Sequence, residues 1–249
     1  MMKERLFQYK RDLPDPRDYL YKNKFQVLKT PPATVDLRPY CPTIEDQGNL
    51  GSCTGNAIVG ALEILQNRSS STFKDMSRLF VYYNERLIEG TINEDSGAYL
   101  RDGIKSVANY GVCTETSWPY NISKYAVKPT DSCYTEALNY KILEYYRLTT
   151  LTEMKSCLTN GRPFVFGFTV YSSFVSSKVA KTGIVPMPLK KEQILGGHAV
   201  VAVGYESNNR RFIVRNSWGS SWGIKGYFYM PFDYLLNPNL ASDFWMIVK

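Results

Sequence analysis

The amino-acid sequence predicts an α+β protein of two lobes with a cleft between them. Its 249 residues are enough for one large domain or two small lobes. The first half contains segments with apolar residues at helical spacing, and the second half contains short runs rich in Val, Ile, Phe and Tyr. A block of helices followed by a block of strands is typical of the α+β class.

Three helices are predicted in the first half, over residues 52–66, 77–89 and 98–110. In each segment the apolar side chains fall on one helical face. Ser52 and Ser77 stand at N-cap positions, where a hydroxyl can accept a hydrogen bond from the first helical turn. A glycine follows each of the last two segments and can end the helix.

The second half predicts strands and one short helix. Thr150 and Glu153 form a capping box for a helix that extends to Leu158. The apolar runs that follow are bounded by Gly, Asn or Pro, as strands usually are. The predicted strands are residues 163–170, 198–205, 212–215, 227–230 and 244–248.

Residues 1–34 are polar, charged and marked by proline, so we expect an extended arm. A disordered tail and a short propiece or inhibitory arm that lies on the rest of the protein both fit this composition. The remaining residues, 35–249, form the predicted domain. Its helical lobe covers about 35–135 and its β lobe about 136–249.

Charge and hydropathy exclude several classes of protein. Lys and Arg number 30 against 23 for Asp and Glu, but the basic residues are scattered, which argues against nucleic-acid binding despite the net charge of +7. No apolar run approaches the roughly 20 residues that a membrane span needs. The N-terminal segment lacks an apolar stretch of roughly 7–15 residues, so we expect no secretory signal peptide.

The numbers of histidines and cysteines limit the catalytic base, the metal sites and the disulfides that the chain can have. The chain has one histidine, His198, so any imidazole base must be this residue and a structural zinc site is not expected. Five cysteines, an odd number, fit reduced intracellular thiols. One bridge, between Cys113 and Cys133, is left open.

Cys53 lies in the first turn of the first predicted helix and is a candidate nucleophile. The positive end of the helix dipole favours a thiolate there. A backbone N–H at the helix start and the side-chain amide of Gln47 can both donate to a developing oxyanion. Gly48 and Gly51 let the backbone turn closely before the helix. A buried structural cysteine is the alternative interpretation.

His198 follows two glycines at the edge of an apolar strand, where its ring can face a cleft. The side-chain carbonyl of Asn216 can accept the imidazole N–H and fix the ring tautomer. Trp218 can cover that hydrogen bond from water. The alternative interpretations are a satisfied polar residue at a strand end, a turn asparagine and an ordinary core tryptophan.

Together these residues supply a nucleophile, a base, an orienting amide and an oxyanion donor. Over roughly residues 35–249 the sequence resembles the papain family of cysteine peptidases, whose order Gln, Cys, His, Asn it repeats. The resemblance implies a papain-like fold with a helical N-terminal lobe and an antiparallel, β-barrel-like C-terminal lobe. Three blocks carry it: Gln47–Cys53, Gly197–Val200, and Asn216–Gly219 with Trp222 and Gly223.

The resemblance implies a role for each matching residue. Cys53 is the implied nucleophile and His198 its partner in a thiolate–imidazolium pair. Asn216 is implied to hold His198, and Gln47 with the Cys53 backbone N–H to form the oxyanion hole. Trp218 is implied to shield the bond between Asn216 and His198 and to lie at the substrate site.

Further cleft residues are implied by the same resemblance. The segment Asp95–Ala98 is similar to the family's glycine-containing segment that pairs with the substrate backbone, which places Gly97 and Ala98 on the cleft wall. Ser242 is implied to approach the pocket for the second residue before the cut bond.

The implied activity is hydrolysis of peptide bonds through an acyl-enzyme thioester on Cys53. A single histidine excludes the paired histidines of the family's carboxydipeptidase branch, so an endopeptidase is favoured. We expect no cofactor and no metal. The expected partner is a peptide or protein substrate, and a monomer is favoured. Intracellular action, in the cytoplasm or another compartment, is expected, and packaging in a particle is also compatible.

The sequence departs from the family pattern at several points. Thr54 follows the nucleophile where a tryptophan is frequent, and Leu50 stands where a disulfide-forming cysteine is frequent. A short arm replaces the usual long helical propiece. These departures keep open a zymogen-like or catalytically silent binding protein whose cleft the N-terminal arm blocks. Transfer of the acyl group to an amine instead of water also stays open.

Overall fold

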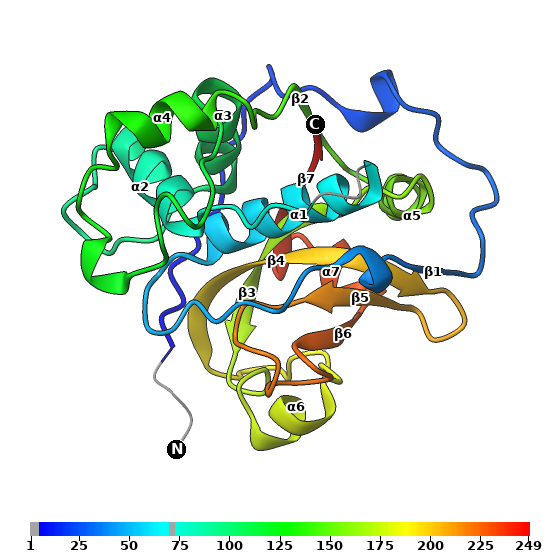
Figure 1. Ribbon diagram of the computed structural model, residues 1–249. Helices are drawn as coiled ribbons and strands as arrows, with labels where there is room; N and C mark the ends of the chain where they lie inside the picture. The colour runs from blue at the N-terminus through cyan, green and yellow to red at the C-terminus, as the bar shows by residue number, and fades with distance from the viewer. Residues whose placement is uncertain (1–4, 70–72) are drawn as a thin grey trace.

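Helices fill the first half of the chain and strands the second in the computed structural model, which describes residues 5–69 and 73–249. The predicted α+β class is confirmed, with a helical N-terminal lobe and an antiparallel sheet in the C-terminal lobe (Figure 1). The helices of the N-terminal lobe are α1 (Cys53–Ser69), α2 (Arg78–Glu89), α3 (Leu100–Tyr110) and α4 (Asp131–Ala137).

The helix ends show why these segments are helical. The Ser77 hydroxyl accepts a hydrogen bond from the Phe80 N–H, 3.1 Å away, which caps α2 as predicted. Gly90 ends α2 with φ of 73°, a left-handed conformation that glycine adopts without strain. α3 begins at Leu100, two residues later than predicted, and α4 was not predicted.

The C-terminal lobe is a twisted antiparallel sheet in the order β2-β7-β3-β4-β5-β6, with β1 paired to β4. The predicted strands are present, whereas β1 and β2 were missed because these short segments, TVD and EYYR, contain charged residues and form no apolar run. The strands are β1 (Thr34–Asp36), β2 (Glu144–Arg147), β3 (Phe164–Tyr171), β4 (Ile194–Glu206), β5 (Arg211–Arg215), β6 (Tyr227–Pro231) and β7 (Ala241–Val248).

Short helices complete the connections. One half of the predicted capping box is present, because the Thr150 hydroxyl accepts a hydrogen bond from the Glu153 N–H. In the other half the Glu153 carboxylate accepts from the Thr149 N–H, and not from the N–H of the cap residue Thr150. The remaining elements are α5 (Leu151–Thr159), α6 (Ser177–Thr182), α7 (Phe232–Leu236) and the 3-10 turns η1 (Tyr21–Asn23), η2 (Arg38–Tyr40) and η3 (Ile122–Lys124).

Helix α1 joins the two lobes. It runs across the middle of the molecule, between the helices of the N-terminal lobe and the sheet (Figure 1). At Gly60 an added Cβ would lie 3.7 Å from Val201 of β4, so helix and strand pack closely. Almost all of α1 is buried and belongs to one continuous core with the sheet. This packing brings the start of α1 next to β4.

The N-terminal arm consists of two parts. Residues 5–12 pass between the lobes. The second part, residues 13–33, runs past β2 and around the outer side of α5 before the chain enters β1 (Figure 1). In the second part Tyr21 is 0% exposed and stacks on Phe25 at 5.0 Å, while the Leu28 N–H donates to Ser156. Tyr21 therefore anchors the second part of the arm to the core, while the residues around it stay exposed or half-buried. The domain boundaries at residues 34 and 135 stay predictions.

The cysteines correct one expectation. All five lie within the described residues and are free thiols, so the bridge left open between Cys113 and Cys133 is absent. The Cys133 thiol is engaged otherwise, with Thr130 Oγ1 at 3.1 Å and the Ser117 carbonyl at 3.6 Å. Among residues 5–69 and 73–249, no helix is long and apolar enough to cross a bilayer.

We expect Tyr21→Ala to lower the free energy of unfolding by about 3–5 kcal/mol, because it leaves a cavity in place of a fully buried ring. The matched control is Tyr19→Ala, whose side chain is 70% exposed and whose loss should change stability by no more than about 0.5 kcal/mol. Urea unfolding measures both. Equal effects would contradict the integration of this part of the arm into the core.

Candidate active site

Cys53 is the first residue of α1 and is 0% exposed. The turn before it is fixed by the Asp95 carboxylate, which accepts from the Gly51 N–H at 3.0 Å. Burial raises the pKa of the Cys53 thiol to about 12, while the backbone N–H groups of Ala199 and Thr54 oppose this rise. The Ala199 N–H belongs to β4, so the thiol lies where helix and strand meet.

His198 lies in β4 and its ring is enclosed. Its Nε2 lies 2.8 Å from Asn216 Oδ1, and since an amide oxygen only accepts, Nε2 carries the proton. The Trp218 ring stacks on the imidazole with centroids 4.9 Å apart. The imidazole Nδ1 makes no hydrogen bond within the described part of the chain. It is therefore the nitrogen available to a thiol.

The protonation of His198 follows from its surroundings. Its side chain is 0% exposed. Burial lowers the pKa of the imidazole to about 4; the hydrogen bond to Asn216 raises it and the charge of Arg5 lowers it further. The ring and the Cys53 thiol are therefore both neutral at neutral pH in this state.

Gln47 is tied to the same block. Its Oε1 accepts from the Ser217 hydroxyl at 2.7 Å, and its backbone N–H donates to the Ser217 carbonyl at 2.9 Å. One proton of its side-chain NH₂ goes to the Leu50 carbonyl. The second proton of that group is left for an oxyanion, so the structure brings Gln47, Cys53, His198 and Asn216 to one place.

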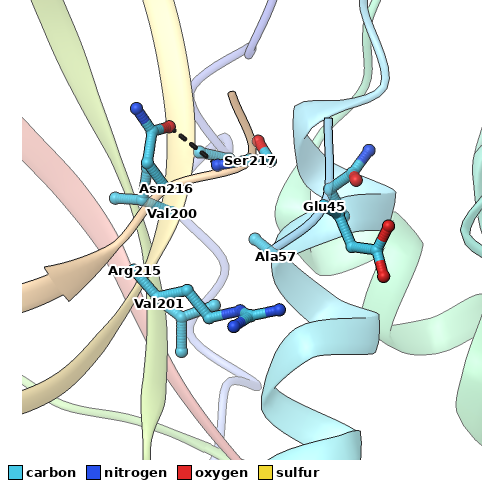
Figure 2. A pocket seen from close by; sticks show the side chains of 9 residues that line it. Glu45, Ala57, Val200, Val201, Arg215, Asn216 and Ser217 are labelled. Carbon is cyan, nitrogen blue, oxygen red and sulfur yellow. Dashed lines mark hydrogen bonds between the residues drawn. The ribbon is translucent and has the colours of Figure 1, made fainter. Parts of the chain in front are cut away.

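A small hollow lies behind these residues, between α1 and the strands β4 and β5 (Figure 2). The Arg215 guanidinium at this hollow donates to the carbonyls of Pro42 and Thr43, at 2.7 and 2.6 Å. Two charge-assisted bonds hold the segment that leads to Gln47 against β5. This role could not be predicted from the sequence, because the guanidinium acts through backbone carbonyls. The hollow is lined by Glu45, Asn56, Ala57, Ala199, Val200, Val201, Arg215, Asn216 and Ser217.

The first part of the arm lies between the lobes at these residues, in a strip that we call the interlobe cleft. The Tyr9 N–H donates to the Gly197 carbonyl at 3.1 Å, and the Gly197 N–H donates to the Phe7 carbonyl at 3.2 Å. On the other side the Lys10 N–H donates to the Ala98 carbonyl at 3.1 Å. The arm backbone thus pairs with both walls of the cleft.

The predicted cleft residue Gly97 lies directly against the arm. A Cβ at Gly97 would lie 1.9 Å from the Gln8 carbonyl oxygen, so only a glycine admits the arm backbone here. Gly97 and Ala98, the residues expected to pair with a substrate backbone, are thus occupied by the chain's own N-terminal segment.

Arg5 anchors the other end of this segment. Its guanidinium lies 2.6 Å from the Asp46 carboxylate and donates to the carbonyls of Gly48 and Trp218, at 3.0 and 3.3 Å. The Phe7 ring meets the edge of Trp218 at 5.9 Å. The arm therefore runs from Trp218, past the reacting pair, to Ala98.

Tyr9 fills a pocket at the far side of the cleft. A Cβ at Gly167 would lie 1.8 Å from the Tyr9 ring, so the missing side chain makes room for it. The Tyr9 hydroxyl lies 2.9 Å from Ser242 Oγ and donates to the Asp243 carboxylate. Ser242 was predicted at a substrate pocket. Asp243 was missed, since nothing in the sequence distinguishes it from other acidic residues.

A hydrogen bond between α1 and α2 was also not predicted from the sequence. The hydroxyl of Thr54, the residue after Cys53, donates to the Glu85 carboxyl in α2. Glu85 is buried, and burial raises its pKa well above the usual range. This bond ties the first turn of α1 to α2. Within the described residues no group of three His, Cys, Asp or Glu side chains is placed to hold a metal ion.

Comparison with known proteins identifies the class. Residues 31–239 match the model of the papain family cysteine proteases. Xylellain, a cysteine protease from Xylella fastidiosa, has a solved structure that is 41% identical, with a TM-score of 0.91 over 100% of this chain and 98% of that one. A peptidase C1-like protein of Acanthamoeba polyphaga mimivirus is 44% identical over 98% of this chain and 86% of its own length.

More distant relatives agree. Cysteine proteinase 1 of Entamoeba histolytica is 30% identical over 81% of this chain, which spans 64% of the longer protein. The chain belongs to the papain family and is a cysteine protease. The family and fold that the sequence predicted are confirmed.

We expect thiol-directed epoxides to alkylate Cys53 slowly in the full chain near pH 6–8, because the raised thiol pKa of about 12 leaves little thiolate. The rate should rise as the pH becomes alkaline. Intact mass with peptide mapping measures it. His198→Ala should change this slow rate little, since His198 is neutral here. Rapid, pH-independent alkylation of Cys53 would contradict the described protonation.

Proposed function

We propose that this cysteine protease is an endopeptidase that cuts peptide bonds within proteins through an acyl-enzyme on Cys53. The observation that carries the proposal is the 2.8 Å contact of His198 Nε2 with Asn216, which leaves Nδ1 to exchange a proton with the thiol. Gln47, already oriented by Ser217, supports the oxyanion.

The proposed reaction has two steps. Cys53 gives its proton to His198 Nδ1, and the sulfur attacks the peptide carbonyl carbon. The Gln47 side chain and the Cys53 N–H stabilise the oxyanion. The intermediate collapses, His198 protonates the leaving amine, and a thioester remains. His198 then takes a proton from water as the water oxygen attacks the thioester. The C–S bond breaks, His198 returns the proton to the Cys53 sulfur, and the acid product leaves and loses its proton to solvent.

The path of the arm supports cleavage within a chain. The arm passes the reacting residues with Arg5 on the Trp218 side and Lys10 on the Ala98 side. A cleft that holds an extended polypeptide on both sides of the reacting pair suits an endopeptidase. The single histidine gives no support to an exopeptidase of the paired-histidine type.

We also propose that the described state is latent. Cys53 and His198 are 0% exposed beneath the arm, so a substrate must displace residues 5–12. If the Ser242 pocket takes the second residue before the cut bond, a substrate runs from Ser242 towards Trp218, and the arm runs the opposite way. A reversed backbone does not present its carbonyls to Cys53 as a substrate does. The arm therefore blocks the cleft without being cut.

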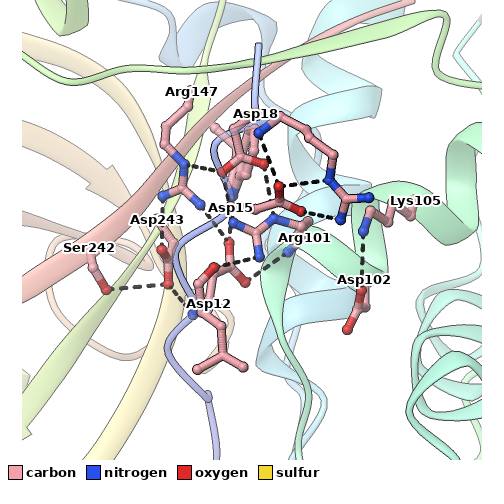
Figure 3. Close-up of polar contacts among 12 residues, drawn as sticks. Asp12, Asp15, Asp18, Arg101, Asp102, Lys105, Arg147, Ser242 and Asp243 are labelled. Atoms are coloured by element: carbon pink, nitrogen blue, oxygen red, sulfur yellow. Dashed lines mark hydrogen bonds and ion pairs between the residues drawn. The ribbon is translucent and has the colours of Figure 1, made fainter. Parts of the chain in front are cut away.

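Side-chain contacts clamp the arm at the end of this segment. Asp12 accepts from the Trp245 indole at 2.9 Å and from Arg147 at 3.2 Å, and its pKa is raised to about 6 by burial and by the nearby Asp243 carboxylate. Asp18 pairs with both Arg101 and Arg147 (Figure 3). The clamp connects α3, β2 and β7, so it spans both lobes.

We expect Cys53→Ala and His198→Ala each to lower hydrolysis of an unfolded protein by about a thousandfold or more, because each removes a group that forms the acyl-enzyme. Cys41→Ala is the matched control, since this half-buried thiol lies outside the site. Fragment masses under reducing conditions give the measurement, and internal cuts indicate an endopeptidase. Undiminished cleavage by the Cys53→Ala chain would overturn the proposal.

We expect Arg5→Ala to raise the rate of Cys53 alkylation at neutral pH by about tenfold or more, because it removes charge-assisted bonds that hold the arm. Arg17→Ala is the control: its side chain is 85% exposed and pairs only with Asp15 of the arm among the described residues. An unchanged rate in the Arg5→Ala chain would contradict latency through the arm.

A further inference from the structure

The pocket that holds Tyr9 has the dimensions and the chemistry of a side-chain specificity site. One wall is the bare backbone of Gly167, whose missing Cβ leaves space for a six-membered ring. A Cβ at a second glycine, Gly197, would lie 2.8 Å from Tyr9 Cδ1. Two adjacent strands, β3 and β4, thus each present a glycine to the ring. The pocket admits a flat aromatic side chain from the cleft.

The floor of this pocket is polar. The Tyr9 hydroxyl meets both Ser242 Oγ, at 2.9 Å, and Asp243 Oδ2. Ser242 Oγ itself lies 3.3 Å from Asp243 Oδ2, so the two side chains form one acceptor site. An aromatic ring without a hydroxyl leaves Asp243 Oδ2 with the Asp12 N–H and the Ser242 hydroxyl as donors, and it forfeits the charge-assisted bond that the Tyr9 phenol makes.

Asp243 is held in place for this contact. Its Oδ1 pairs with Arg147 at 3.0 Å, which leaves Oδ2 for the pocket and for the Asp12 N–H (Figure 3). Its φ is 59°, a left-handed conformation that is uncommon for a residue other than glycine. The strand β7 thus keeps a strained residue at this position, as happens at functional sites.

The pairing with Arg147 decides which donor fits. Arg147 is shared with Asp12 and Asp18, but it places a guanidinium on the other oxygen of the Asp243 carboxylate, so a second cation at Oδ2 would stand close to that guanidinium. A neutral phenol hydroxyl donates one proton there and meets no such repulsion. The chain's own Tyr9 is the example that the structure provides.

We propose that Asp243, with Ser242, determines specificity and selects a substrate with tyrosine at the position that this pocket receives. The substrate class is thus an unfolded or extended polypeptide with a tyrosine close to the cut bond. If this pocket is the one that the family resemblance assigns to Ser242, the tyrosine is the second residue before that bond. This proposal rests on the proposed endopeptidase function. It does not depend on the direction in which the arm lies, because the pocket binds a side chain.

The hydrolysis test uses the full chain carrying Tyr9→Ala, which empties the pocket and keeps the rest of the arm. The probes are fluorogenic acetyl-Xaa-Arg amides with Tyr, Phe or Arg as Xaa. We expect kcat/KM for the Tyr probe to exceed that for the Phe and Arg probes by about ten- to a hundredfold. A Tyr to Phe ratio near one, or a preference for Arg, would overturn the proposal.

Asp243→Asn in the same background should bring the Tyr to Phe ratio below about threefold, since the charged acceptor is gone. Asn tolerates a positive φ, which keeps the strand conformation accessible. Ser242→Ala is the matched variant and should lower the ratio less. The ratio of the two rates does not depend on how much of the enzyme is folded. Alkylation of Cys53 measures the concentration of folded enzyme separately. An unchanged ratio in Asp243→Asn would exclude Asp243 as the determinant. If the Asp243→Asn variant does not fold, the Tyr to Phe ratio is compared between the Tyr9→Ala chain and the same chain with Ser242→Ala. An equal ratio in these two chains would then overturn the proposal.

A binding measurement on an inactive variant tests the tyrosine pocket separately from the endopeptidase activity. In a full chain carrying Cys53→Ala and Tyr9→Ala, calorimetry compares the Kd of acetyl-Tyr-Arg and acetyl-Phe-Arg amides. Tighter binding of the Tyr peptide by about tenfold, lost in Asp243→Asn, supports the pocket even if no probe is hydrolysed, and only the proposed function then fails. Hydrolysis of the probes with equal binding and equal rates overturns the pocket and leaves the endopeptidase intact.

Discussion

The packing of α1 against β4 is the constraint on which the site depends. Cys53 begins the helix and His198 lies in the strand, so the contact between α1 and β4 sets the positions of both side chains. Neither side chain can reach water in this state, and the hydrogen bond from His198 to Asn216 leaves a single ring nitrogen for the thiol. A residue remote in sequence supports the same region, since Arg215 of β5 holds the segment before Gln47 in place.

The arm satisfies the backbone groups that line the cleft. The carbonyls of Gly197 and Ala98 and the Gly197 N–H face the cleft, and the arm supplies partners for all three. By excluding water it also changes the chemistry beneath it, because burial favours the neutral thiol and the neutral imidazole. The same segment thus covers both side chains and keeps both of them neutral.

The sequence predicts those features that are encoded locally. Ser77 and Gly90 mark the ends of α2 because caps act within one turn, and the spacing of residues around Cys53, His198 and Asn216 identifies the family. Features that depend on distant contacts could not be predicted. Tyr21 lies in a polar, proline-rich segment yet enters the core, and Asp243 acquires its role from contacts with Tyr9 and Arg147.

The most direct test of this account is amide hydrogen exchange at Tyr9 and Lys10 in the full chain, whose N–H groups bond to Gly197 and Ala98. We expect both amides to be protected in the free protein and to lose this protection once a peptidyl epoxide is bound to Cys53, while the amide of Leu28, bonded to Ser156, stays protected. Free exchange at Tyr9 and Lys10 before the inhibitor is added would contradict it.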